Sequence, residues 1–311
     1  MEKGVTRVQN TGKKKKKKYT RQNFYEFLCV VPAIILMLVI SYYPIVELFR
    51  ISFTDWNLIR PTYSYVGLNN WEWLVKTIKI NHVLNSFAAT LKYTVGHMAI
   101  ILVVGLLLAL LFNRMTKGFA VMRSIVFLPH YVAMSTAALI FLVMLNENYG
   151  VFNYILESLA GIRVGWLSNG PLAMLVMILI ASWRSIGYDM LIYLSGMQGI
   201  SRQYYEAAML DGANSRQILF KITLPLLAPT TLFLAVTQFI SSMKVYAVAD
   251  VLTAGGPYRA TEVLVYLIYS MAFVDYRVDR ASVVAICFFL FLLLVTILTM
   301  DVSDRKVNYD A

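Results

Sequence analysis

Residues 88–112, AATLKYTVGHMAIILVVGLLLALLF, decide the fold of this chain. The segment contains one charged residue, Lys92, and none from Tyr93 to Phe112. A helix needs about 20 predominantly apolar residues to cross about 30 Å of bilayer hydrocarbon. We therefore expect this segment to be a membrane-spanning helix.

Five further segments have the same length and apolar character. Together with the first they predict six spans, near residues 27–49, 88–112, 119–145, 172–197, 225–249 and 281–300. The apolar run at 262–273 is too short to span, and we expect an interfacial or re-entrant helix there. The predicted fold is all-α and polytopic, with a basic tail at 1–26, a transmembrane domain at 27–300 and a C-terminal tail at 301–311.

Composition supports a membrane protein and excludes a soluble domain. Hydrophobic residues make up 59% of the 311 residues and charged residues only 14%, where about 25% is usual in soluble domains. The net charge of +11 does not indicate nucleic-acid binding, because much of it lies in Lys13–Lys18 and Arg21, directly before the first span. We expect this basic run to set topology and to touch anionic lipid. Cys29 and Cys287 lie in apolar segments and are expected to be core residues rather than a disulfide.

The distribution of basic residues predicts the orientation. With the amino terminus in the cytosol, the cytosolic segments hold nine Lys or Arg in the tail, three in 113–123, three in 198–224 and two after Met300. These are 17 of the 28 basic residues. Both termini are therefore expected in the cytosol, as is the loop between the fourth and fifth spans.

That loop, residues 199–224, has the pattern of two short helices. Ser201 is suited to cap the first helix, and Asp211-Gly212 is suited to end it, because Gly adopts the left-handed conformation after a helix. Asn214, with Gln217 three residues later, has a near capping-box pattern for the second helix. The sequence thus predicts a cytosolic helix-turn-helix, and its apolar side chains indicate that it binds a partner.

Three motifs in the loop carry a resemblance to a known family. They are Glu206-Ala207-Ala208, Asp211-Gly212-Ala213 and Ile222-Thr223-Leu224-Pro225. Their combination, just before the penultimate span, resembles the EAA loop of permease subunits in binding-protein-dependent ABC importers. Thr253–Pro257 is similar to a segment of carbohydrate permeases of the maltose and glycerol-phosphate importer type. The chain departs from that group at Ala247, where an acidic residue is common, and at Asp279-Arg280, which leaves the identity of the sugar open.

The resemblance implies the other parts of the transporter. The expected partners are a second, homologous permease in a heterodimer, a cytosolic ATPase dimer, an extracytoplasmic sugar-binding protein and membrane lipid. The EAA helix is expected to sit in a groove of the ATPase, with contacts from Tyr204, Glu206, Ala207, Ala208, Leu210, Asp211, Gly212, Leu224 and Pro225. The chain itself would be a non-enzymatic permease of a bacterial-type plasma membrane that translocates a carbohydrate, with an oligosaccharide favoured.

No catalytic, cofactor or metal site is predicted in this chain. Gly12-Lys13 lacks the upstream Gly of a phosphate-binding loop, so ATP and Mg are expected on the partner ATPase. His82, His97 and His130 lack metal-ligand spacing. An ion-coupled secondary transporter would need intramembrane acids and an internal repeat, and Asp189 is the only firm acidic candidate in a span. A membrane enzyme would need a cluster of Asp, His or Arg at one interface, and no such cluster stands out in the sequence. An ABC permease for a solute other than a sugar remains an open alternative.

Polar and aromatic residues within two spans suggest the substrate path. Charged residues in spans usually face a protein interior or a wet cavity, and sugars suit rings for stacking beside hydrogen-bonding groups. The expected lining residues are Trp183, Arg184, Tyr188 and Asp189 in the fourth span and Gln238, Lys244 and Tyr246 in the fifth. Alternatively, Arg184 and Asp189 form a structural ion pair, and Lys244 extends to the membrane interface.

Overall fold

The computed structural model describes residues 21–306 except 79, 81 and 114–116, and the chain divides into two units at Arg50. The first unit is a long apolar helix that the structure divides into α1 (Arg21–Met37), the π-turn η1 (Leu38–Tyr42) and α2 (Tyr43–Ser52). The π-turn ends two residues before Pro44. Proline lacks the amide that would bond the carbonyl of Ile40, so the helix widens at this turn. Of the tail predicted at 1–26, residues 1–20 lie outside the described residues, and the remainder belongs to α1.

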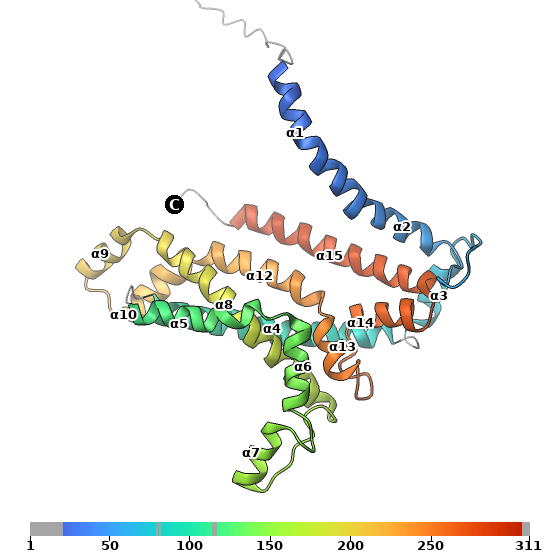
Figure 1. Cartoon of the computed structure of the whole chain (residues 1–311). Helices are drawn as coiled ribbons and strands as arrows, with labels where there is room; N and C mark the ends of the chain where they lie inside the picture. Colours follow the sequence, from blue (N-terminus) through green and yellow to red (C-terminus); the bar gives the residue numbers. More distant parts are fainter. Residues whose placement is uncertain (1–20, 79, 81, 114–116, 307–311) are drawn as a thin grey trace, which may run out of the picture. The chain divides into compact units, whose positions relative to one another are not determined.

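The second unit is a helical bundle around α4 (Val83–Phe112) and α8 (Gly170–Gly199), which pack along each other. In Figure 1, α12 (Ala228–Met243) and α15 (Val278–Lys306) run beside this pair. Small residues permit close packing of the central pair: a Cβ on Gly105 of α4 would lie 3.0 Å from the Cβ of Asp189 on α8. Helix α8 starts where its sequence predicts, because Asn169 accepts a hydrogen bond from the amide of Leu172.

The third predicted span, 119–145, is not one continuous helix. The chain forms α5 (Lys117–Phe127), the 3-10 turn η2 (Leu128–Tyr131) and α6 (Met134–Met144), and the two halves are bent by 93°. Pro129 lies in η2, and Val132 and Ala133 are extended, so the helical hydrogen-bond ladder is interrupted here. The span expected at 119–145 is therefore a bent pair of helices, which can count as one crossing.

The fifth predicted span, 225–249, is also divided. A helical segment made of α10 (Ser215–Ile218), the π-turn η3 (Leu219–Thr223) and α11 (Leu224–Leu226) meets α12 at a bend of 58°. Pro225 and Pro229 flank this bend, and η3 ends two residues before Pro225, as η1 does before Pro44. Helix α12 ends at Met243, and α13 (Ala247–Thr253) begins after three further residues. The span predicted at 225–249 is therefore not one continuous helix at this end either.

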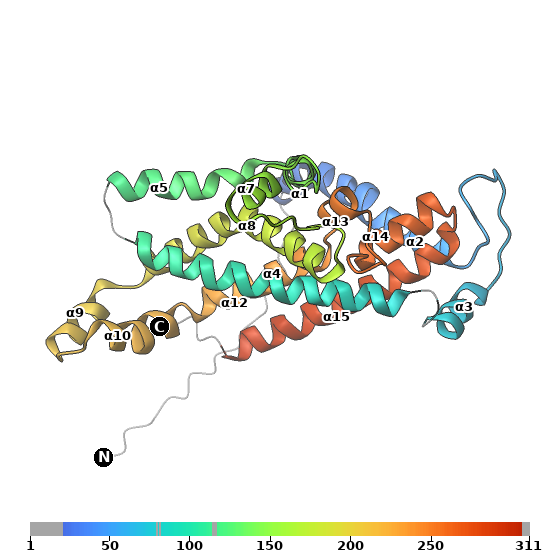
Figure 2. The same ribbon diagram turned by 90° about the horizontal axis from the view of Figure 1, so that it is seen from below.

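The opposite ends of the bundle carry different short elements. Figures 1 and 2 both place α9 (Arg202–Leu210) and α10 at one end, and α3 (Asn69–Thr77) and α14 (Leu264–Tyr269) at the other. Helix α14 continues as the π-turn η4 (Ser270–Val274), so the apolar run at 262–273 forms a short helix. Helix α7 (Val151–Ala160) follows α6 and projects from the bundle in Figure 1.

The described helices agree with a polytopic membrane protein. Four are long and apolar enough to cross a bilayer, and the number is six if each bent pair counts as one crossing. The four are Glu26–Ser52, Val83–Phe112, Gly170–Gly199 and Val278–Thr299. Over the described residues there is no strand, only an isolated bridge between Thr54 and Tyr65.

Candidate functional site

The loop at 199–224 has a well-defined helical structure. Ser201 caps α9 by accepting a hydrogen bond from the amide of Gln203, and no residue of α9 is buried. Asn214 and Gln217 form a reciprocal capping box at the start of α10, with the amide of each accepted by the side chain of the other at 2.8–2.9 Å. The caps predicted from sequence at both helices are confirmed.

Gly212 makes the turn between α9 and α10. Its φ is +75°, which Gly adopts without the steric cost of a side chain. The amide of Ala213 then bonds the carbonyl of Ala208 at 2.9 Å, closing the end of α9. A hydroxyl contact of 3.4 Å between Tyr205 and Thr223 joins α9 to η3. The loop is thereby connected through η3 and α11 to α12.

The nine residues expected to contact an ATPase lie on this loop or at its end. Seven are exposed and two, Ala208 and Leu224, are half-buried; the exposed ones are Tyr204, Glu206, Ala207, Leu210, Asp211, Gly212 and Pro225. Leu210 is 89% exposed and Phe220 66%, and both lie outside the four long apolar helices. The end of the bundle thus presents an apolar surface with Glu206 and Asp211 beside it.

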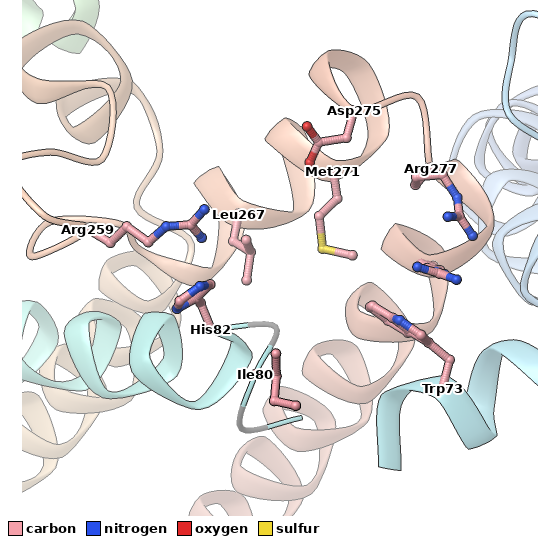
Figure 3. A pocket seen from close by; sticks show the side chains of 9 residues that line it. Trp73, Ile80, His82, Arg259, Leu267, Met271, Asp275 and Arg277 are labelled. Carbon is pink, nitrogen blue, oxygen red and sulfur yellow. The ribbon is translucent and has the colours of Figure 1, made fainter. Parts of the chain in front are cut away.

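A pocket that the sequence did not predict lies at the opposite end of the bundle. It measures about 340 Å³, and Figure 3 shows Trp73, His82, Arg259, Asp275 and Arg277 around it. The guanidinium of Arg280 lies 4.6 Å from the centre of the Trp73 ring, a cation-π distance. Two of its arginines already have acidic partners: Arg259 contacts Glu262 at 3.3 Å, and Arg277 contacts Asp279 at 3.0 Å.

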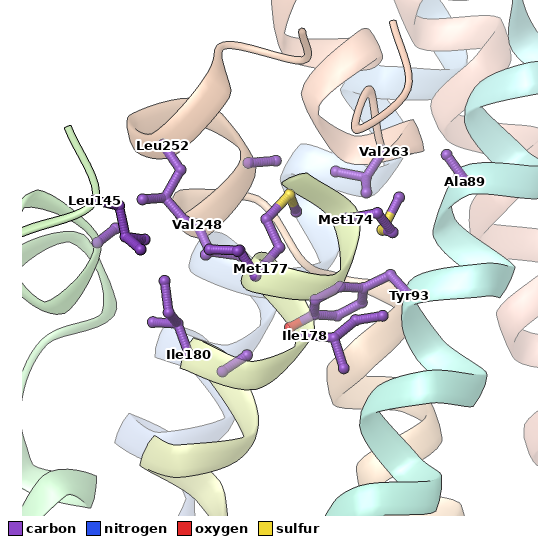
Figure 4. Packing of buried hydrophobic residues seen from close by; sticks show 14 residues of the cluster. Ala89, Tyr93, Leu145, Met174, Met177, Ile178, Ile180, Val248, Leu252 and Val263 are labelled. Carbon is purple, nitrogen blue, oxygen red and sulfur yellow. The ribbon is translucent and has the colours of Figure 1, made fainter. Parts of the chain in front are cut away.

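The second cavity, which we call the central cavity, measures about 330 Å³ and lies among α4, α6, α8, α12 and α13. Its polar lining comes from Tyr93, His97, Arg184, Ser185, Ser241, Ser242, Lys244 and Tyr246. Tyr93 also belongs to the buried cluster of Figure 4, where it reaches from α4 towards Ile178 of α8. The wall of the cavity at Tyr93 is therefore part of the packed core.

Three of the seven residues expected on the substrate path line the central cavity. They are Arg184, Lys244 and Tyr246. Arg184 does not pair with Asp189: its Nε donates to the carbonyl of Val132 at 2.8 Å. That carbonyl lies at the break between η2 and α6, so the guanidinium satisfies a backbone group that the break releases.

The other four residues lie outside the lining of this cavity. Gln238 donates a hydrogen bond of 2.6 Å to Asp189, and this buried pair joins α12 to α8. Tyr188 stacks on His130, with ring centres 5.2 Å apart. Trp183 is 44% exposed and meets Phe141 of α6 edge to face at 5.5 Å. In this chain these four residues thus contact neighbouring helices.

Sequence analysis noted only that His97 lacks metal-ligand spacing, and it did not single out the serines. His97 is buried, its Nδ1 lies 3.0 Å from the hydroxyl of Ser182, and its side chain lines the cavity. The available signal was a histidine within the largely apolar segment 93–112. Ser185 and Ser241 gave no comparable signal, because small hydroxyl residues are common in membrane helices.

A row of aromatic rings leads away from the central cavity. Tyr246 lies 5.1 Å from Tyr269, and Tyr269 lies 5.3 Å from Phe273, measured between ring centres. Tyr269 and Phe273 belong to α14 and η4, at the end of the bundle opposite α9. Tyr269 is 39% and Phe273 is 58% exposed. The rings offer stacking surfaces between that end and the cavity.

The residue types that hold metal ions are not grouped in the part of the chain that the structure describes. Among the described residues no three His, Cys, Asp or Glu side chains are placed to hold a metal ion. His97 and His130 instead stack on Tyr93 and Tyr188, at 5.5 and 5.2 Å.

Comparisons of the sequence with a family profile and with known proteins agree with each other. Residues 101–309 match the profile of the binding-protein-dependent transport system inner membrane component family. The chain is 29% identical over 284 residues to the sn-glycerol-3-phosphate transport system permease protein UgpA of Agrobacterium fabrum, covering 91% of this chain and 96% of that protein. It is 30% identical over 276 residues to a "Probable ABC transporter permease protein" of Pyrococcus horikoshii, covering 88% and 93%.

A solved structure has the same fold. A chain of a bacterial ABC transporter involved in the import of the acidic polysaccharide alginate superposes with a TM-score of 0.81. The superposition covers 93% of this chain and 98% of that chain, at 24% sequence identity.

Proposed function

This chain belongs to the family of binding-protein-dependent transport system inner membrane components, and we propose that it passes a carbohydrate, delivered by an extracytoplasmic binding protein, through an ATP-driven importer. Membership of the family and the apolar helices make it a multi-pass inner-membrane protein. The observation that carries the proposal is the exposed, apolar helix-turn-helix at 199–224, because such a surface needs a partner.

The partner of this loop is a cytosolic ATPase. Ala207 and Ala208 have small side chains that allow a second protein to approach the α9 backbone closely, and exposed Glu206 can pair with a basic group. When the ATPase dimer closes on ATP, it displaces α9. The contact between Tyr205 and Thr223 joins α9 to η3, so the displacement is passed on to α12.

ATP and Mg belong to that partner and not to this chain. The only Gly-Lys pair of the sequence, Gly12-Lys13, lacks the upstream glycine of a phosphate-binding loop. The proposal therefore requires two ATPase subunits, and also a second permease, which together with this one encloses the solute. The loop and both termini are cytosolic, in agreement with the 17 basic residues in the segments on that side.

A carbohydrate is the solute that the residues favour. The relatives from which the proposal draws are named for sn-glycerol-3-phosphate and for alginate. Thr253–Pro257 resembles carbohydrate permeases, and the row formed by Tyr246, Tyr269 and Phe273 suits the weakly apolar faces of sugar rings. The central cavity supplies hydroxyl and charged groups at the inner end of this row.

The test is to disrupt the proposed ATPase contact at the 199–224 loop and to measure both ATP hydrolysis and transport. We expect tagged wild-type chain to co-purify from its native membrane with an ATPase and a second permease. Glu206→Lys and Gly212→Arg should lower binding-protein-stimulated ATPase activity and uptake at least tenfold, because each places a positive charge at the docked surface. The chain should remain in the membrane, because position 212 has open space around it.

Gly118→Arg is the matched control. Gly118 is also exposed and has open space around it, but it lies on α5, outside the loop. Gly212→Ala separates backbone strain from bulk, since any side chain at a φ of +75° carries strain. Wild-type uptake in both loop variants, or loss of uptake in Gly118→Arg as large as in Gly212→Arg, would contradict the proposed docking.

A further inference from the structure

Most of the polar side chains around the central cavity can donate hydrogen bonds. Its side chains present the cations Arg184 and Lys244, the ring of His97, and the hydroxyls of serines and Tyr246. No Asp, Glu, Asn or Gln is among the residues that line it. Sugar hydroxyls donate as well as accept hydrogen bonds, so a site for a neutral sugar needs strong acceptors. The lining of this cavity is rich in donors and poor in strong acceptors.

The two cations lack a carboxylate partner. Within the described residues neither Arg184 nor Lys244 forms a salt bridge. Asp189 accepts a hydrogen bond from Gln238, and neither Asp189 nor Asp250 lines the cavity. Arg184 uses its Nε for the carbonyl of Val132, which holds the guanidinium at the cavity wall.

Uncompensated charges in a membrane domain are costly. Arg184 lies within the long helix α8, and a charged side chain inside a membrane helix usually marks a substrate or ion pathway. Ser242 adds a second sign of an incomplete site. It is 4% exposed, lines the cavity, and its hydroxyl has no hydrogen-bond partner among the described residues. An oxygen-rich anion would satisfy the hydroxyl and both cations.

We propose that the central cavity receives the anionic group of a negatively charged sugar, a phosphate ester or a carboxylate. This inference rests on the proposed function, since it concerns the solute of the same permease. Arg184 and Lys244 supply the charge, and the hydroxyls of Ser241 and Ser242 donate to the anion. The ring of Tyr246 lies beside them and stacks on the sugar, with Tyr269 next along the path.

The first measurement reads the charge of the cavity directly. A thiol is placed in the lining by Ser241→Cys, in a background in which Cys29 and Cys287 are replaced by serine. The assembled transporter in lipid nanodiscs is then treated with an anionic reagent, sulfonatoethyl methanethiosulfonate, or a cationic one, trimethylammonioethyl methanethiosulfonate. Asn148→Cys, at an exposed position after α6, gives the ratio of the two rates away from the cavity.

The expected result is a higher anionic-to-cationic rate ratio at position 241 than at 148. One unit charge about 8 Å away in water changes each rate roughly 2.4-fold in opposite directions, so the ratio should change roughly sixfold for each cation. Lys244→Gln should remove about this factor and Lys244→Arg should keep it. Lys76→Gln is the control for losing a cation elsewhere: Lys76 pairs with Glu72 on α3 and lowers the pKa of that carboxyl.

The second measurement identifies the anion. Protection of the thiol at 241 is compared for glycerol 3-phosphate, glucuronate and glucose at equal concentration. Protection by glycerol 3-phosphate alone indicates a phosphate ester, protection by glucuronate alone indicates a carboxylate, and both outcomes support the proposal. Equal protection by glucose, no protection by either anion, or no reaction at 241 would overturn it.

Failure here is distinct from failure of the proposed function. If the ATPase co-purifies and Glu206→Lys uncouples it, the chain is an importer permease whatever the charge ratio shows. An unchanged ratio in Lys244→Gln, with uncoupling intact, would reject only the anionic solute. Substitution of Arg184 would also break its hydrogen bond to the carbonyl of Val132 and could disturb folding. Lys244→Gln avoids this, because Lys244 is exposed and its side chain makes no hydrogen bond to another described residue.

Discussion

Gly187→Ala should separate two helices whose backbones touch. A Cβ at position 187 of α8 would lie 2.4 Å from the carbonyl oxygen of Val126 and 2.6 Å from the Cα of Phe127. Both of these are backbone atoms at the end of α5, so no side chain can rotate away. To restore an ordinary contact of 3.4 Å, α5 and η2 must move about 1 Å away from α8. Added atoms in a packed interior typically cost about 1–3 kcal/mol.

The displacement should also disturb the cavity. Arg184 precedes Gly187 by one helical turn on the same face, and it bonds the carbonyl of Val132 at 2.8 Å across this interface. A shift of about 1 Å would lengthen that bond beyond hydrogen-bond range and release the guanidinium. We therefore expect a lower apparent melting temperature of the purified protein and a lower rate of solute uptake in the same variant.

Gly199→Ala is the matched control, because Gly199 ends the same helix and has open space around its Cβ position. Alanine is favoured over glycine in a helix by about 0.5–1 kcal/mol, so this variant should be as stable as wild type or slightly more stable. Equal melting temperatures for Gly187→Ala and wild type would refute the close approach of α8 and α5 and the positioning argument built on it.

Three more results are expected. A cysteine at Asn214 should resist an impermeant thiol reagent in intact cells while one at Asn148 reacts; the reverse pattern would invert the orientation. Tyr269→Ala should lower uptake at least fivefold and Tyr269→Phe should not, since stacking needs the ring and not its hydroxyl; equal loss in both would exclude stacking. Gln238→Leu should destabilise the protein by about 1–3 kcal/mol in a denaturant titration, because Asp189 loses its donor, and an unchanged midpoint would show that this hydrogen bond contributes little.

Local patterns were readable from the sequence, and the 199–224 loop shows why. A cap depends on residues within about three positions of each other, so Ser201, Gly212 and the pair of Asn214 and Gln217 could be assigned without knowing the rest of the fold. The apolar length of the spans is equally local. The long helices at 83–112, 170–199 and 278–299 therefore lie close to their predicted positions.

The bend in the third span could not be read in the same way. Pro129 signals a possible interruption, but a proline is often tolerated in a membrane helix when its surroundings satisfy the freed backbone groups. Here the group that satisfies the carbonyl of Val132 is Arg184, 52 residues further along the chain. Hydropathy measures neither this contact nor the close approach at Gly187, so it predicted a span at 119–145 without its bend.

The cavity was predicted only in part for a related reason. Arg184, Lys244 and Tyr246 were noticed because charged and aromatic residues are conspicuous in apolar segments. His97 and Ser241 join them only when α4, α8 and α12 pack together. Asp189 and Gln238 were equally conspicuous in the sequence, yet they face each other between α8 and α12. Whether such a residue lines the cavity or pairs with a neighbouring helix depends on the direction in which its side chain leaves its own helix.

The same helix connects both parts of the site. The 199–224 loop continues through η3 and α11 into α12, and α12 ends at Met243, directly before Lys244 in the cavity wall. Two prolines flank the bend of 58° before α12. Because proline has no amide to donate, few hydrogen bonds need to break when the angle of this junction changes. At its other end α12 is tied to α8 by the bond between Gln238 and Asp189, one to two turns from Lys244. A displacement of α9 would therefore reach the cavity as a movement of Lys244 against Arg184, and would change the spacing of the two charges that we propose hold the solute.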